Sequence, residues 1–139
     1  MKFQVESAIA KAPEEAFDAM ADVRNETRWN SKVSRSEIVG AEPIREGSVF
    51  ETVNRGKTYR AVISKFDRPE LLAFEVTGAP MDETVTFRFR PSDGGTALAA
   101  EFDMRPKGFV KVMLPLLKSV IRKDLIAQFR SFASFCEGR

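Results

Sequence analysis

Residues 109–136 read FVKVMLPLLKSVIRKDLIAQFRSFASFC and form the longest helical pattern in the chain. At about 100° per residue, one face of this helix is apolar and the other polar. The apolar face carries Leu114, Leu117, Ile121, Leu125, Phe129, Phe132 and Cys136, and the polar face Ser119, Lys123, Arg130 and Ser134. Because the apolar face has no partner within the helix, another part of the chain must cover it.

Pro115 interrupts this pattern, because proline lacks an N–H and its ring clashes with the preceding turn. We expect a kink there, or a helix that begins near Pro115 after a separate turn over residues 109–114. From Pro115 to Cys136 the helix would span about 33 Å. Two polar residues fall on its apolar side. Gln128 is either a hydrogen-bonded core amide or a group facing a cavity, and Lys118 lies at the edge, where its stem can pack while its head reaches water.

The rest of the chain has mostly the two-residue period of strands. Phe3, Val5, Ser7 and Ile9 alternate with polar or small residues. A first short helix is expected from Pro13, followed by a short helix or turn over Asn25–Trp29. Six further strands are then predicted between turns rich in Gly, Pro and Asn, over Ser34–Val39, Ser48–Val53, Tyr59–Phe66, Leu71–Thr77, Thr84–Arg90 and Ala97–Met104.

These patterns predict an α+β helix-grip fold. A curved antiparallel sheet of about seven strands would wrap around the long C-terminal helix, with two short helices after the first strand. The sheet and the helix each have one apolar face, so each is the other's natural cover. No repeat or linker divides the chain, and we expect a single domain over residues 1–139.

Composition excludes several classes of function. A net charge of +2, with basic and acidic residues well mixed, argues against a nucleic-acid partner. The absence of His rules out a Ser-His triad and, with one Cys, the common zinc sites. No GxGxxG or P-loop spacing occurs, so no cofactor is expected. The sequence has neither a signal peptide nor a membrane-span pattern, and with the single Cys136 we expect a cytoplasmic protein, monomeric or homodimeric.

Acid or base chemistry would therefore depend on a carboxylate or a tyrosine. Glu51 has the parity of Val49 and Val53, and Tyr59 that of Ala61, so both are weak catalytic candidates if they face inward. A buried carboxylate of raised pKa is a typical acid or base. Glu51 would instead be exposed if it lies at a strand end or if a bulge reverses the parity.

The chain as a whole resembles the START and polyketide cyclase-like superfamily, which includes relatives of the birch pollen allergen. The resemblance depends on residues 9–17, Trp29 after Asn25, Glu46-Gly47-Ser48, Phe66-Asp67-Arg68-Pro69 with Leu72 and Phe74, and Gly94-Gly95-Thr96. It implies a hydrophobic cavity between sheet and helix that takes up lipids, polyketides, hormones or other apolar molecules. Some members of the superfamily cyclise aromatic rings, and others are carriers or regulators.

We therefore predict binding of a hydrophobic small molecule, with a polyketide cyclase or dehydratase as the alternative. The expected ligand-binding residues are Trp29, Tyr59, Phe74, Phe87, Phe89, Phe102, Leu117, Ile121 and Gln128. Inward phenylalanines are more often packed core than pocket wall, so the interpretation of Phe74, Phe87, Phe89 and Phe102 as core stays open. The lack of His favours a binder over an enzyme. An interaction module with an exposed apolar groove is a third possibility.

Overall fold

All seven strands belong to one antiparallel sheet, in the order β1-β7-β6-β5-β4-β3-β2, in a computed structural model that describes residues 1–139. Neighbouring strands along the chain pair with each other, except that β1 pairs with β7, which leaves β1 and β2 at the edges. The strands are β1 (Lys2–Ile9), β2 (Val33–Val39), β3 (Val49–Asn54), β4 (Lys57–Asp67), β5 (Leu71–Gly78), β6 (Met81–Ser92) and β7 (Gly95–Pro106).

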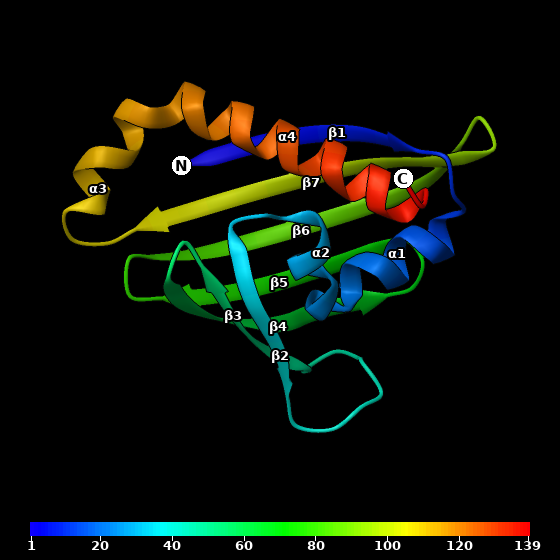
Figure 1. Cartoon of the computed structure of the whole chain (residues 1–139), viewed down its shortest axis with the longest axis horizontal. Coiled ribbons are helices and arrows are strands. Elements are labelled where there is room, and N and C mark those ends of the chain that lie inside the picture. The colour runs from blue at the N-terminus through cyan, green and yellow to red at the C-terminus, as the bar shows by residue number, and fades with distance from the viewer.

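The helices lie on one face of this sheet (Figure 1). They are α1 (Pro13–Ala21), the short 3-10 turn η1 (Val23–Asn25), α2 (Glu26–Trp29), α3 (Val110–Met113), the 3-10 turn η2 (Leu114–Leu117) and α4 (Lys118–Cys136). The predicted helix-grip fold is confirmed. No helix combines the length and apolar composition needed to cross a bilayer.

The predicted strands are present, but β6 and β7 are longer than expected. We placed Pro91 in the turn after the sixth strand, whereas it lies inside β6 opposite Thr96, and the turn is at Asp93 and Gly94. The pairing of β5 with β6 begins at Arg88, so Pro91 lies beyond that ladder and its missing N–H breaks no bond with β5.

Pro115 divides the C-terminal helical region as predicted. The chain makes one turn of α3, then the 3-10 turn that contains Pro115, and only then the 19 residues of α4. The missing N–H of Pro115 thus falls near the start of a new element, where a donor is not needed.

The C-terminal half of α4 is packed against the sheet, and its start is not. Leu125, Phe129 and Phe132 are buried in a core that includes Phe3 and Phe102. The prediction that another part of the chain covers the whole apolar face from Leu114 to Cys136 is wrong at its N-terminal end, because Leu117 of η2 is 41% exposed. The long sheet covers the second half of the helix, but only the cavity described below lies beneath the first.

Substitutions at two neighbouring residues of α4 test how this helix packs against the sheet. Leu125 is 4% exposed and Ile126 is 40% exposed. We expect Leu125→Ala to lower the free energy of unfolding by about 2 to 5 kcal/mol, because it leaves a hole in the core. Ile126→Ala, the matched control, should cost about 1 kcal/mol or less. Urea unfolding of both variants measures the difference, and equal losses would contradict this packing.

Candidate ligand cavity

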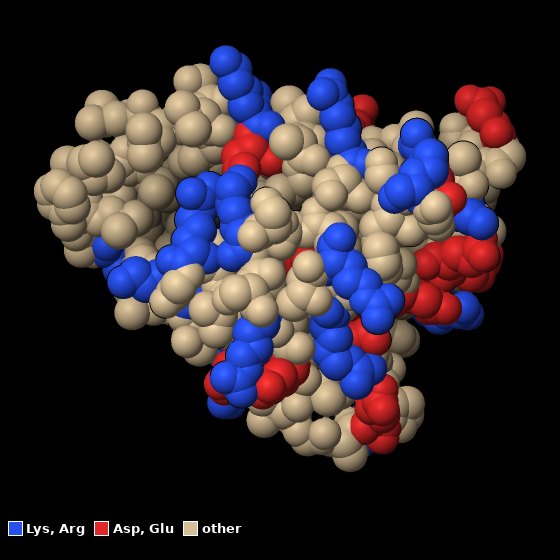
Figure 2. All heavy atoms as spheres, viewed as in Figure 1, with Lys and Arg blue, Asp and Glu red and all other residues tan.

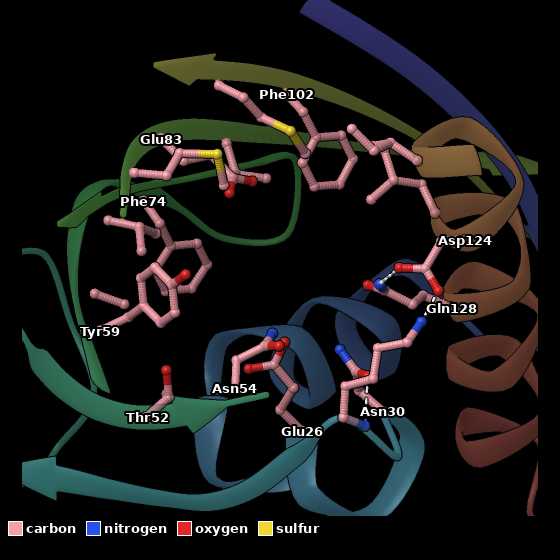
Figure 3. Close-up of a pocket in the computed structure, with 18 of the residues that line it drawn as sticks. Glu26, Asn30, Thr52, Asn54, Tyr59, Phe74, Glu83, Phe102, Asp124 and Gln128 are labelled. Atoms are coloured by element: carbon pink, nitrogen blue, oxygen red, sulfur yellow. Dashed lines mark hydrogen bonds and ion pairs between the residues drawn. The ribbon is translucent and has the colours of Figure 1, made fainter. Parts of the chain in front are cut away.

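A cavity of about 520 Å³ lies between the concave face of the sheet, α2 and the start of α4 (Figure 3). Of the 30 residues that line it, 19 are hydrophobic. This volume and composition are typical of sites for small organic molecules, which bury an apolar body and use a few polar groups for orientation.

Four phenylalanines form the boundary between the cavity and the packed core. Phe87 is the centre of the group, with ring centroids 6.1 Å from Phe74, 6.4 Å from Phe102 and 6.2 Å from Phe129. The two-residue period of β5, β6 and β7 turns three of these rings inward, and the helical period of α4 supplies the fourth. These four rings pack in the core on one side and line the cavity on the other.

The structure places most of the predicted site residues on the cavity wall. Those lining it are Trp29, Tyr59, Phe74, Phe87, Phe102, Leu117, Ile121 and Gln128. Whether they bind a ligand remains a prediction. Phe89 does not line the cavity; it is buried beside Phe17, with centroids 5.5 Å apart, at the end of the sheet that α1 covers.

Glu51 points away from the cavity, so its candidacy as an inward acid or base is wrong. Its side chain is 49% exposed and pairs with Arg60 at 3.5 Å on the outer face of the sheet. The parity of β3 is the reverse of the one assumed. Phe50 and Thr52 are buried on the inner face, and the bulky Phe50 fixes which face is inside.

Two carboxylates that the sequence analysis missed do face the cavity. Glu26 is the first residue of α2, and Glu83 lies on β6 with the same parity as Val85 and Phe87 (Figure 3). The predicted strand began at Thr84, and extending its alternation by one residue would have identified Glu83. Glu26 had a weaker signal, its position three residues before Trp29 in a short helix.

The surroundings of these two carboxylates favour their protonated forms. Neither forms an ion pair within the chain, and protein atoms surround both although the cavity leaves them partly accessible. Burial raises the pKa of Glu26 to about 7, and the Asn30 amide opposes that rise. Burial also raises the pKa of Glu83 to about 7, with a further contribution from the charge of Glu26.

Tyr59 completes this polar part of the wall. It faces Gly78 across the β4–β5 ladder, and a side chain at Gly78 would collide with the Tyr59 ring. The glycine therefore makes room for the ring at the cavity wall. Burial and the neighbouring Glu83 raise the pKa of the Tyr59 phenol, so the hydroxyl remains protonated near neutral pH.

At the mouth, Asp124 of α4 is a shared partner for three side chains. It forms ion pairs with Lys32 and, at 3.7 Å, with Arg55, and it accepts a hydrogen bond of 2.9 Å from Gln128. Gln128 is thus hydrogen-bonded and also lines the cavity, so the two alternatives given for it from the sequence, a hydrogen-bonded amide and a group facing a cavity, both apply. These contacts tie α4 to the segments before β2 and after β3.

The sequence matches a family model described as polyketide cyclase / dehydrase and lipid transport, over residues 1–137. The chain belongs to this family. No curated protein matches it.

Solved structures similar to this member of the family share its fold at low sequence identity. A protein from Thermus thermophilus has a TM-score of 0.80 at 16% identity, covering 99% of this chain and 98% of that one. Ara h 8.0201 has a TM-score of 0.73 at 17% identity, covering 100% and 99%. A START superfamily protein from Mycobacterium smegmatis has a TM-score of 0.70 at 13% identity, covering 93% and 97%. The family match confirms the polyketide cyclase-like resemblance inferred from the sequence, and these structures show that the fold is shared.

The raised pKa of Glu83 predicts a particular pH dependence of stability. Between about pH 4.5 and about pH 7, Glu83 keeps a proton in the folded protein that it has lost in the unfolded chain, so the free energy of unfolding falls as pH rises. Above about pH 7 the carboxylate is ionised in both states, and the cost of burying its charge is fully present. Glu83→Gln should therefore raise the free energy of unfolding above about pH 7, by about 1 to 3 kcal/mol.

Chemical denaturation of both proteins between about pH 5 and about pH 8 measures this difference. Glu51→Gln is the matched control, because its carboxylate is on the outer face, and it should keep the slope of the unsubstituted protein in this range. If Glu83→Gln and the unsubstituted protein have the same slope, Glu83 is not the source of the pH dependence.

Proposed function

We propose that the protein binds an amphipathic small molecule whose apolar body fills the cavity. The observation that carries this proposal is a cavity of about 520 Å³ with a largely hydrophobic wall and two carboxylates that have no cationic partner in the chain. A solid core would have filled this space with side chains, since protein interiors are normally close-packed. Family membership supports the same conclusion.

The polar groups of the wall support a ligand with at least one hydrogen-bond donor. Glu26 and Glu83 are acceptors when ionised, and each can also donate when protonated. Tyr59 and Asn54 lie on the same wall and form no side-chain hydrogen bond within the chain. A hydroxyl or amine on the ligand would satisfy groups that are otherwise left in an apolar space, whereas a ligand carboxylate would be repelled by the two acids.

A cyclase or dehydratase activity is the second candidate, and one observation favours it. An acid or base works best when its pKa is close to the ambient pH, and Glu26 and Glu83 are both raised to about 7. Either carboxyl could remove a proton from a polyketide-like ligand while the other donates one. Binding of an apolar ligand is required by both candidates, and it is therefore the first property to test.

Narrowing the cavity should weaken binding of an apolar probe. Val76 lines the cavity from β5, whereas Val62 of β4 has the opposite parity and lies on the outer face of the sheet. We expect Val76→Phe to weaken binding of N-phenylnaphthylamine at least about tenfold, equivalent to about 1.4 kcal/mol. The measurement is a titration of probe fluorescence, together with the emission of the lone Trp29 on the cavity wall.

Val62→Phe is the matched control and should leave the affinity unchanged, because its added ring lies outside the cavity. A probe that binds both variants equally well would place the binding site elsewhere. Two negative results together would contradict the proposed function. They are that the probe does not bind the unsubstituted protein, and that native mass spectrometry releases no small molecule from the purified protein.

Glu83→Gln separates the carrier from the enzyme. Once a ligand is identified by native mass spectrometry, the variant should bind it within about threefold of the unsubstituted protein if the amide replaces the carboxyl as a hydrogen-bond partner. If the protein is an enzyme, turnover of that ligand should fall more than about tenfold with affinity retained, because the acid or base is gone. Turnover that survives in Glu26→Gln and in Glu83→Gln excludes both carboxyls from the chemistry.

A further inference from the structure

The segment from Phe109 through the first turn of α4 exposes an unusual amount of apolar surface. Of the eight large hydrophobic residues that are exposed in the structure, six lie in the twelve positions from 109 to 120: Phe109, Val112, Met113, Leu116, Leu117 and Val120. Phe109 is 75% exposed and Leu116 is 76% exposed. Figure 2 shows the lobe over α3 and η2 as a surface almost free of charged atoms. Contiguous apolar surface of this kind marks an interaction site.

The charges of this segment are all of one sign. Residues 107–123 contain Lys107, Lys111, Lys118, Arg122 and Lys123, and no Asp or Glu. Lys107 pairs with Asp82, and Arg122 lies over the Phe3 ring. The other three lysines form no ion pair within the chain. Exposed apolar side chains with unpaired lysines around them are the composition of segments that lie in the interface of an anionic bilayer.

The same segment forms one side of the cavity mouth. Val110, Leu114 and Ile121 line the cavity, while Phe109, Val112 and Leu116 are turned to the outside. Figure 2 shows a hollow beside this lobe with Lys and Arg side chains along its other edge. Lys32 and Arg55 are among the residues that line the cavity. A surface that receives the exposed residues would thus lie directly at the opening.

We propose that residues 107–123 dock onto an anionic membrane surface, with Phe109, Val112 and Leu116 among the acyl chains and Lys111 and Lys118 at the lipid headgroups. Docking in this way would set the cavity mouth against the bilayer. A second copy of the chain fits this surface less well, because a two-fold interface would bring the same lysines together with no acidic residue on the segment to pair with them.

Sedimentation with lipid vesicles tests the docking surface and needs no knowledge of the ligand. We expect the protein to bind vesicles of phosphatidylcholine and phosphatidylglycerol, to bind phosphatidylcholine alone much more weakly, and to be released by added salt. Phe109→Ser with Leu116→Ser should weaken binding to the mixed vesicles at least about tenfold. Lys111→Gln with Lys118→Gln should weaken it by a similar factor and reduce the dependence on salt.

Two sets of control substitutions lie outside the segment. Ile126→Ser removes an exposed apolar side chain from a later turn of α4, and Lys57→Gln with Lys65→Gln removes two exposed charges from β4. Both sets should bind vesicles as the unsubstituted protein does, and circular dichroism melts check that every variant is folded.

Several outcomes would overturn the proposal. One is equal binding to neutral and anionic vesicles, or binding to neither. Another is a loss of binding in the controls that matches the loss in the segment variants. A third is a homodimer, detected by analytical ultracentrifugation, that Phe109→Ser with Leu116→Ser dissociates while vesicle binding is absent. Failure of vesicle binding would leave the cavity and its probe binding untouched, so the two proposals fail separately.

Discussion

The contact of Phe129 with Phe87 and Phe102 is where the helix and the sheet hold each other. The ring of Phe129 is 6.2 Å from Phe87 and 5.9 Å from Phe102, which come from the two longest strands. Each partner depends on the other, because most of the stability of a helix in a protein comes from packing of its apolar face, and a sheet with a bare apolar face is prone to aggregate. Burying both faces in one interface stabilises the two elements together.

The cavity exists because that interface extends along only part of the helical region. From Leu125 onward α4 is pressed onto the sheet, and Phe17 of α1 fills the same end beside Phe66 and Phe89. Toward the start of α4 no element fills the space between helix and sheet. Since the phenylalanines at the boundary belong to both core and wall, a substitution there changes stability and the shape of the cavity together. Wall positions beyond the boundary, such as Val76, separate the two effects better.

The open end combines features that a core would not tolerate. Glu26 and Glu83 remain without a cation in a mostly apolar space, which costs stability whenever they are ionised. Across the opening, α3 and η2 have two apolar faces. One face lines the cavity, and the opposite face is exposed to solvent. Both features lower the stability of the isolated protein, and both are understandable if this end meets a ligand or a surface.

Hydrophobic period and turn residues are local properties, so the order of elements, the antiparallel sheet, the break at Pro115 and most of the aromatic wall could be predicted from the residues alone. The sequence could not determine the parity of β3, where Val49 and Val53 suggested one face and the packing of Phe50 selected the other, nor that Phe89 packs on Phe17 and not at the cavity. The tertiary structure alone brought Glu26 and Glu83 into one cavity, from segments more than fifty residues apart. The alternation along β6 could have placed Glu83 on the inner face, but whether a carboxylate there is solvated or buried depends on which distant elements surround it.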